Sequence, residues 1–200
     1  MCTSAIHRVI EQHSARRGDS IALVHGDRSL TYRDLNQRAN ARARQLIAHG
    51  FRRGSLAVVR MEHSLELAVT LLAVLKAGGA YSWLEGDEGG SWPAGVSIVL
   101  DEGGDQQRCL AVDIAGDGPM HSAPNLPIVT RVSDVACVLR DQNGMPSILV
   151  PHETITALHV QPIPAHARWG AEPGALDLWL ALMAGSTAVL VADAVESAAA

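Results

Sequence analysis

Cysteine is scarce in this sequence, which limits the covalent and metal-bound scaffolds that could hold the chain together. The 200 residues include three cysteines, Cys2, Cys109 and Cys137, and no two of them stand at the spacing of a metal-ligand pair. An odd, scattered set excludes a disulfide framework and fits a reducing compartment, where free cysteine acts as a small core residue. The nine histidines are scattered too, and their spacing predicts no metal site.

Long hydrophobic runs are also missing. The longest uncharged apolar stretch, residues 178–192, is interrupted by Gly185, Ser186 and Thr187, and it is shorter than the ~20 residues that a membrane span needs. The first residues contain no apolar signal-peptide run. We therefore expect a cytoplasmic protein with no membrane partner.

The net charge of -5 gives no general reason to expect nucleic-acid binding. The charge is unevenly spread: residues 1–60 hold 11 Arg against 4 acidic residues (+7), and the remainder holds 5 basic against 17 acidic residues (-12). A bipolar chain could dock head to tail with a partner, although solvated charged faces are the plainer interpretation. With 48% hydrophobic residues the chain can bury a sizeable core, and no boundary divides it.

The first half reads as alternating helices and strands. Hydrophobic spacing predicts a helix over residues 4–15, a hairpin over 21–31, a buried strand over 56–59, an apolar helix from Ser64 to Gly78, and a strand over 80–83. Thr31 and Asp34 resemble a capping box at the start of a further helix. The buried stripe of that helix is expected to comprise Tyr32, Leu35, Ala39, Ala43, Leu46 and Ile47. The order strand, helix, strand predicts a βαβ unit with a parallel sheet.

The second half is richer in glycine and proline. Strands are expected over residues 96–100, 109–114, 135–139, 148–150 and 187–191, with helices over 151–158 and 176–183. Residues 85–95 are a predicted loop, because four glycines and a proline cannot sustain a helix. Trp83 and Trp179 lie in apolar runs and are expected in the core, whereas Trp92 and Trp169 are candidates for exposure.

Two segments of the first half carry a family resemblance. Residues 30–36 read L-T-Y-R-D-L-N, and residues 75–81 read L-K-A-G-G-A-Y. In this order and at this separation they resemble the first two core motifs of the amino-acid adenylation domains of nonribosomal peptide synthetases, L-T-Y-x-E-L-N and L-K-A-G-x-A-Y. The resemblance is close over residues 6–83 and weaker over 84–196. The motif residues, which are structural in character, are Thr31, Tyr32, Leu35, Lys76, Gly78 and Tyr81.

The resemblance implies both a fold and a chemistry. The fold would be α/β, part of the N-terminal subdomain of an adenylate-forming enzyme, with a mixed sheet and flanking helices; residues 1–200 would form one truncated domain. Members of this family activate an amino acid with ATP and magnesium to give an aminoacyl-adenylate, and the acyl group then passes from AMP to the thiol of a carrier protein. That chemistry needs a Gly/Ser/Thr loop around the phosphates and lysines to neutralise developing charge.

The expected phosphate loop is altered in this sequence. In the family it reads approximately Y-T-S-G-S-T-G-x-P-K-G and lies between two strands. The residues at that place here are Arg140, Asp141, Gln142, Asn143, Gly144, Met145, Pro146 and Ser147. The Ser/Thr/Gly run is gone, the loop is shorter, Asp141 brings negative charge, and Ser147 stands about where the lysine belongs. A plain turn built on Asn143-Gly144 is the favoured interpretation.

Lysine is almost absent from the whole chain. Lys76 is the single lysine, and it belongs to the second structural motif. The second catalytic lysine of the family, which lies in a C-terminal lid, has no counterpart here. Arg140 is the nearest cation to the altered loop, but a guanidinium does not replace a compact ammonium.

A third family motif, F-D-x-S-x-x-E, contacts the amine of the substrate. Its best register here is residues 171–177, which keeps acids at Glu172 and Asp177 but loses the Phe and Ser and gains a proline. These two residues are a possible remnant of the motif. An acidic residue interacting with the dipole of the following helix is the favoured alternative.

Three hypotheses for function follow. The first is a degenerate, non-catalytic module of nonribosomal peptide synthesis, a binding or structural piece or a remnant, for which no cofactor is expected. The second is a split subunit of an amino-acid adenylating enzyme, completed by another chain and using ATP and magnesium. The third is a binding role on the same scaffold, with a peptide synthetase or a carrier protein as partner and strong salt dependence.

Overall fold

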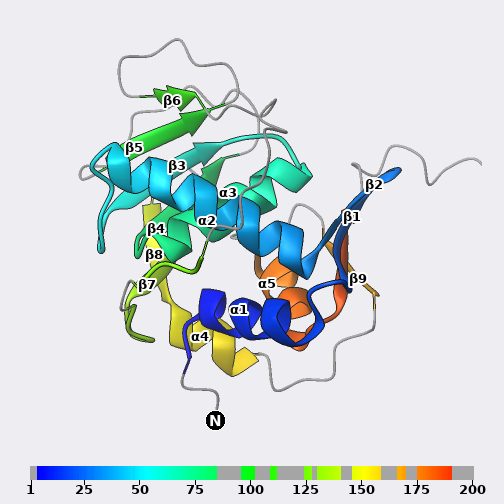
Figure 1. Ribbon diagram of the computed structural model, residues 1–200. Helices are drawn as coiled ribbons and strands as arrows, with labels where there is room; N and C mark the ends of the chain where they lie inside the picture. The colour runs from blue at the N-terminus through cyan, green and yellow to red at the C-terminus, as the bar shows by residue number, and fades with distance from the viewer. Residues whose placement is uncertain are drawn as a thin grey trace, which may run out of the picture.

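The computed structural model describes residues 4–84, 96–101, 109–111, 124–127, 130–140, 146–158, 166–169 and 175–190. Helices and strands alternate along them (Figure 1). The helices are α1 (Ile6–Arg17), α2 (Tyr32–Ala48), α3 (Leu65–Lys76), α4 (His152–Leu158) and α5 (Leu176–Ala184). The strands are β1 (Ile21–His25), β2 (Arg28–Thr31), β3 (Leu56–Arg60), β4 (Ala80–Leu84), β5 (Val96–Asp101), β6 (Cys109–Ala111), β7 (Val135–Arg140), β8 (Pro146–Pro151), β9 (His166–Trp169) and β10 (Thr187–Leu190).

These strands form two sheets. One has the order β6-β5-β3-β4-β7-β8, in which only β8 runs antiparallel to its neighbour. The other has the order β2-β1-β10-β9, in which the hairpin strand β2 is antiparallel. The predicted βαβ unit is confirmed, because β3 and β4 are parallel and α3 joins them. Strand β9 was not predicted from the sequence; it pairs with β10 as an edge strand.

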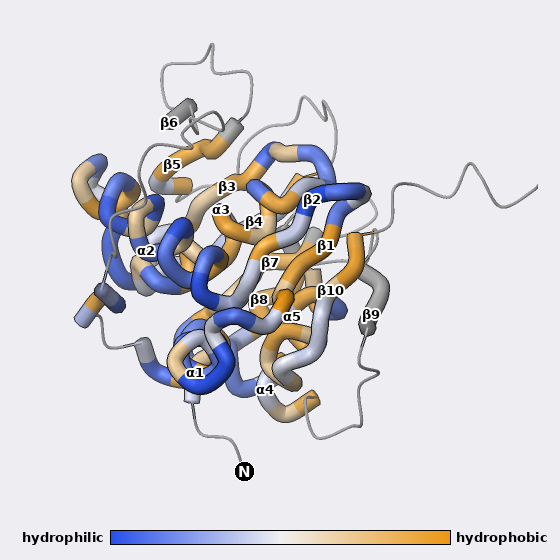
Figure 2. Tube along the Cα trace, turned by 45° about the vertical axis from the view of Figure 1, so that its right-hand side comes forward, coloured by the Kyte–Doolittle hydropathy of each residue, from blue (hydrophilic) through white to orange (hydrophobic). Residues whose placement is uncertain are grey.

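Helices α3 and α5 lie between the two sheets. Helix α3 contacts β3 and β4 on one side and β1 on the other, and α5 packs against β9 and β10. Figure 2 shows why: α3 and α5 are largely hydrophobic, whereas α2 carries hydrophilic residues along much of its length. Burying an apolar helix on both sides removes the most hydrophobic surface from water. The core of the protein is therefore this central helical layer.

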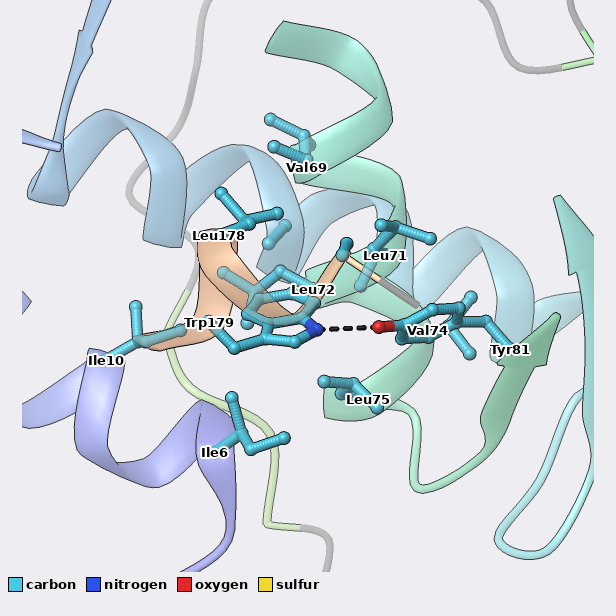
Figure 3. Close-up of a cluster of buried hydrophobic side chains, with 14 of the residues drawn as sticks. Ile6, Ile10, Val69, Leu71, Leu72, Val74, Leu75, Tyr81, Leu178 and Trp179 are labelled. Carbon is cyan, nitrogen blue, oxygen red and sulfur yellow. Dashed lines mark hydrogen bonds between the residues drawn. The ribbon is translucent and has the colours of Figure 1, made fainter. Parts of the chain in front are cut away.

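Trp179 of α5 stands at the middle of that layer. It is fully buried, and its Nε1 donates a hydrogen bond to the Tyr81 hydroxyl of β4 at 2.6 Å. Ile10 and Leu72 surround the indole from α1 and α3 (Figure 3). The expectation that Trp179 is a core residue is confirmed, and its side chain connects α5 with Tyr81 of the second motif.

The other tryptophans have different surroundings. Trp83 of β4 is only half-buried; its Nε1 donates to the Met61 carbonyl oxygen at 3.0 Å, and its ring packs edge-on against His63 with centroids 4.6 Å apart. The expectation of a core position for Trp83 is therefore met only in part, since the residue lies at the margin of the cluster. Trp92 and the rest of the predicted loop over residues 85–95 lie outside the described residues.

Helix α2 begins and ends as its sequence predicts. The Thr31 hydroxyl accepts a hydrogen bond from the Asp34 N–H at 3.1 Å, and the Asp34 carboxylate accepts from the Thr31 N–H at 3.4 Å, which completes the capping box. Gly50 follows the helix with a φ of 87°, a left-handed conformation that glycine adopts without a Cβ clash. One prediction is wrong: Ile47 is 37% exposed, because it lies at the margin of the stripe.

Replacing Thr31 with alanine is expected to lower the free energy of unfolding by about 1 kcal/mol, since the Asp34 N–H loses its acceptor. Urea unfolding followed by circular dichroism measures the change. The Thr31→Ser variant keeps the hydroxyl and serves as the matched control. An equal loss in both variants would show that the Thr31 methyl group, and not the cap, is responsible.

The second motif closes α3 into β4. Ser64 caps the helix by accepting from the Leu67 N–H at 3.1 Å, and Gly78 ends it with a φ of 83°. Gly79 allows a close approach, because a Cβ there would lie 2.3 Å from the ring of the buried Phe51. The motif therefore joins helix to strand.

Within the described residues, no helix is long and apolar enough to cross a bilayer.

Candidate functional site

Strands β7 and β8 lie on either side of the connection that the sequence predicts to be an altered phosphate loop. Strand β7 is parallel to β4, so Arg140, its last residue, lies at the carboxyl edge of the larger sheet. Strand β8 returns antiparallel, with Pro146 paired to Arg140 and Ser147 following it. Asp141, Gln142, Asn143 and Gly144 lie outside the described residues. Open parallel sheets commonly bind their ligands at this edge, and the connection between β7 and β8 begins and ends there.

Strand β7 is fixed by its burial in the core. Ala136 and Cys137 are fully buried, and Cys137 is in register with Tyr81 of the second motif. Burial raises the pKa of the Cys137 thiol to about 12, despite the opposing hydrogen bond from Tyr81. The thiol is neutral at ordinary pH and is not a nucleophile. The strand that leads to the loop is therefore a structural support.

His152 lies at the opposite end of β8, at the amino edge of the sheet. Its ring is fully buried; Nδ1 accepts a hydrogen bond from the Ile6 N–H at 3.3 Å, and the His7 ring packs edge-on with centroids 5.9 Å apart. Burial lowers the pKa of His152 from 6.5 to about 4, and the charge of Asp134 opposes the shift. This neutral imidazole holds the start of α1 in place, and its distance from the loop agrees with a structural role.

The single lysine is also at the amino edge. Lys76 ends α3, directly before β4 begins, and its side chain is 1% exposed and ion-paired with Glu11 of α1. Burial lowers the pKa of Lys76 to about 8, because the desolvation of the ammonium outweighs the attraction of Glu11. The side chain joins α1 to α3. It lies at the end of the strands opposite to the loop.

Comparison with known proteins shows which family the chain resembles. Residues 10–89 match the family described as AMP-binding enzyme. The chain is 31% identical to bacitracin synthase 1 of Bacillus licheniformis over 74% of its length, and 29% identical to malpibaldin synthetase of Mortierella alpina over 93% of its length. Residues 10–89 therefore belong to the AMP-binding enzyme family, and the likeness to peptide synthetases extends over most of the chain. It spans 3% of the first of these two proteins and 4% of the second.

Solved structures of Klebsiella oxytoca NpsA share the fold. The chain superposes on the N-terminal subdomain of Klebsiella oxytoca NpsA in complex with 3-hydroxybenzoyl-AMSN with a TM-score of 0.78 at 20% identity, over 98% of this chain and 56% of that one. An artificially fused adenylation–PCP di-domain, NpsA-ThdA, gives a TM-score of 0.78 at 21% identity, over 94% and 40% of the two chains. The expected fold, an α/β part of the N-terminal subdomain, is thereby confirmed.

Only part of the third motif, residues 171–177, lies within the described residues. Glu172 lies outside the described residues. Asp177 is half-buried in the first turn of α5, where a carboxylate interacts favourably with the helix dipole. The helix has no side-chain cap, and Ala175 precedes it with a left-handed φ of 55°. The position of Asp177 therefore agrees with the favoured alternative, and its part in substrate recognition stays a prediction.

A cavity of about 510 Å³ lies at the amino edge, beside the ends of β3, β4 and β7. Arg53 and Asp134 line it and form a bidentate ion pair, with Nε–Oδ2 and Nη2–Oδ1 distances of 2.9 and 2.8 Å. The hydrogen bond from Arg53 lowers the pKa of the Asp134 carboxyl. No pattern in the sequence signals this pair, because the two residues are 81 positions apart. The cavity lies at the edge of the sheet opposite to the connection between β7 and β8.

Proposed function

We propose that this chain is an adenylation-domain-like module of nonribosomal peptide synthesis that does not form an aminoacyl-adenylate by itself. The observation that carries the proposal is the position of Lys76, buried at the amino edge and paired with Glu11. Adenylate formation concentrates negative charge at the phosphates, and preorganised cations must neutralise it there. No second lysine exists in the chain to do so.

The composition of the loop supports the same conclusion. Asp141 places a carboxylate within the connection, and the only basic residue between Val135 and Pro151 is Arg140. A carboxylate beside a triphosphate repels it, with a strength that grows as water is excluded from the site. One arginine and one aspartate leave the connection without net positive charge. The triphosphate of ATP therefore has little positive charge to hold it.

The purified chain is expected to show no rise in melting temperature with millimolar Mg-ATP. A site with a Kd tenfold below the ATP concentration would stabilise the fold by about 1.4 kcal/mol, which raises the midpoint by roughly 3–6 °C in a chain of this size. The double variant Asp141→Thr with Ser147→Lys restores the charge pattern of the family and is the control for a competent frame. A clear shift, or pyrophosphate exchange, by the unaltered chain contradicts the proposal.

A second candidate is a split subunit of an amino-acid adenylating enzyme. The retained β7–β8 frame at the carboxyl edge favours it, since a chain with no link to nucleotide chemistry needs no such frame. The chain also spans about half of the NpsA N-terminal subdomain, at 56%. The test is pyrophosphate exchange after mixing the chain with a polypeptide that supplies the remaining part of an adenylation domain. Turnover by the mixture alone supports this candidate and displaces the first.

The partner and compartment form part of the same proposal. The relatives include malpibaldin synthetase and bacitracin synthase 1, and one structural neighbour is fused to a PCP domain, which supports a synthetase or carrier protein as the partner. The scattered cysteines support the cytoplasm as the location. Binding of a carrier protein, measured by calorimetry, should weaken with salt if the basic residues of positions 1–60 provide the contact. Affinity that does not change with salt would exclude an electrostatic contact.

A further inference from the structure

The cavity at the amino edge of the larger sheet has the dimensions of a small-molecule site. Its volume of about 510 Å³ falls within the ~300–1,000 Å³ that such sites span. Small residues at the starts of β3, β4 and β7 form its walls: Gly54, Gly78, Ala80, Ser133 and Val135. The space beside Gly54 is open, since a Cβ there would meet no atom within 4 Å beyond its own chain neighbours. A small ligand therefore has room beside the Arg53–Asp134 pair.

Arg53 offers hydrogen-bond donors at this cavity. Its Nε and Nη2 donate to Asp134, which uses two of the five N–H donors of a guanidinium. The remaining donors, on Nη1 and Nη2, have no partner in the part of the chain that the structure describes. The side chain lines the cavity and is 42% exposed. These donors are therefore available to a ligand that enters the cavity.

Asp134 adds an acceptor beside these donors. Its Oδ2 accepts from Arg53 Nε and from the Arg131 N–H, each at 2.9 Å, which fixes the carboxylate on its own turn. Among the described residues Oδ1 accepts one hydrogen bond, from Arg53 Nη2, and a carboxylate oxygen has room for a second. The ion pair therefore presents donors and an acceptor side by side, held in place by two turns.

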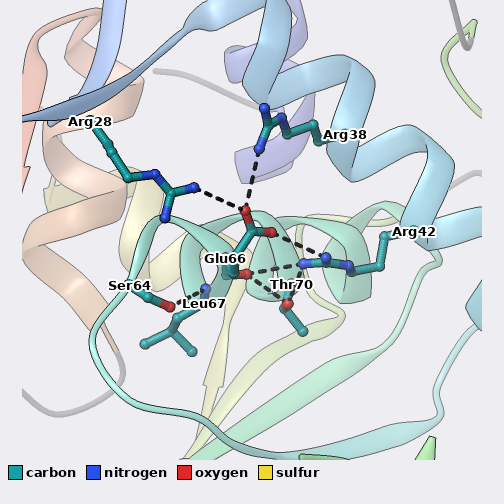
Figure 4. Close-up of polar contacts among 7 residues, drawn as sticks. All are labelled: Arg28, Arg38, Arg42, Ser64, Glu66, Leu67 and Thr70. Atoms are coloured by element: carbon teal, nitrogen blue, oxygen red, sulfur yellow. Dashed lines mark hydrogen bonds and ion pairs between the residues drawn. The ribbon is translucent and has the colours of Figure 1, made fainter. Parts of the chain in front are cut away.

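The charges around Glu66 form a different arrangement, a clamp between elements. Glu66 of α3 is 5% exposed. Its carboxylate has three guanidinium neighbours, at N–O distances of 3.2, 3.3 and 3.9 Å: Arg42, Arg38 and Arg28 (Figure 4). These side chains of α2 and β2 enclose the carboxylate and join it to α3. The Asp134 side chain is 24% exposed, so the pair at the cavity is open to a ligand as the Glu66 carboxylate is not.

The two charges of the Arg53–Asp134 pair cancel, which determines the kind of ligand that fits. Within the described residues, no other ionisable side chain lines the cavity. A carboxylate that approached Arg53 would also meet the Asp134 carboxylate, and an ammonium at Asp134 would meet the Arg53 guanidinium. A neutral carboxamide avoids both repulsions, because its carbonyl oxygen accepts a hydrogen bond and its N–H donates one.

We propose that this cavity binds a small neutral carboxamide, whose carbonyl oxygen accepts from Arg53 and whose N–H donates to Asp134 Oδ1. The small residues of the walls leave space for the apolar part of the ligand. The site does not depend on the proposed function, because it lies at the edge of the sheet opposite to the connection between β7 and β8.

The test compares three ligands of similar size and different charge. Propionamide, propionate and propylammonium are titrated at equal ionic strength into the full chain labelled with nitrogen-15. Shifts of the backbone amide signals of Gly54 and Ser133 report binding at the cavity. Propionamide is expected to bind most tightly. Equal or tighter binding of either ion, or the absence of shifts at these two amides, would overturn the proposal.

Two variants should change the preferred ligand in opposite directions. Asp134→Asn keeps an oxygen acceptor for the turn but leaves a positively charged site, so propionate should become the preferred ligand. Arg53→Gln leaves a negatively charged site and should favour propylammonium. Each variant loses one hydrogen bond to propionamide and should bind it roughly fivefold more weakly.

Arg33→Gln is the matched control. Arg33 also forms a surface ion pair, with Asp19 at 2.8 Å and a side chain 54% exposed, but it does not line the cavity. This variant should keep the order of the three ligands. If Asp134→Asn and Arg53→Gln keep the wild-type order too, or if Arg33→Gln changes it, the pair is not the binding group and the proposal fails.

Discussion

Replacing Trp179 with alanine is expected to lower the free energy of unfolding by about 3–5 kcal/mol, the usual range for removing a large aromatic side chain from a core. The indole is fully buried between the two sheets and belongs to the main hydrophobic cluster. Its removal leaves a cavity and takes the Nε1 donor from the Tyr81 hydroxyl, which lies 2.6 Å away. Urea unfolding followed by far-ultraviolet circular dichroism measures the loss.

Two further variants separate the causes of that loss. Trp179→Phe keeps most of the packing and removes the donor, so it should cost less than Trp179→Ala. Trp83→Ala is the matched control, because Trp83 is half-buried at the margin of the same cluster. It should cost clearly less than Trp179→Ala. If the two alanine variants lose the same amount, the central helical layer does not hold the sheets together as described.

Acidification from pH 6.5 to pH 4 is expected to lower the stability of the fold by about 3 kcal/mol through His152 alone. In the unfolded chain the imidazole takes up its proton near its ordinary pKa of 6.5, whereas in the folded chain burial lowers the pKa of His152 to about 4. Between these values the unfolded state binds more protons, so stability falls as the pH falls, by about 1.4 kcal/mol per pH unit. His7 acts in the same direction, because burial and then the charges of His152, Lys76 and Arg8 lower its pKa well below 6.5.

The measurement is the urea midpoint at a series of pH values between 7 and 4. The His152→Asn variant removes the titrating group, and the comparison uses the slope of stability against pH, which remains informative if the variant is less stable at every pH. Its slope should be shallower than that of the wild type. A wild-type midpoint that stays constant through this window would contradict a buried, neutral His152.

The local parts of the fold could be predicted from the sequence because their causes are local. The Thr31 capping box, the end of α2 at Gly50 and the parallel β3–α3–β4 unit depend on residues a few positions apart. The exposure of Ile47 could not be predicted in this way, since the width of a buried stripe depends on what packs against it. The division of the strands into two sheets, and strand β9, depend on partners distant in the sequence.

The features of the candidate site also separate into those that the sequence predicts and those that it does not. The altered loop and the scarcity of lysine are visible in the sequence, and the strands on both sides of the loop were predicted correctly. The pairing of Lys76 with Glu11, 65 positions away, was not predicted, because nothing in the periodicity of α1 marks Glu11 as the partner of a buried ammonium. The convergence of Arg28, Arg38 and Arg42 on Glu66 was missed for the same reason.

The contacts of α5 also determine when this protein can complete its folding during synthesis. The two motif tyrosines reach α5: the Tyr32 hydroxyl lies 3.0 Å from the Leu182 carbonyl oxygen, and Tyr81 accepts from Trp179, 98 positions later. A ribosome adds about 5–20 residues per second, so the nascent chain waits roughly 5–20 s between making Tyr81 and making its partner. During that interval α5 does not yet cover the apolar surface of α3. We expect a chaperone that shields nascent chains to act on this surface in that period.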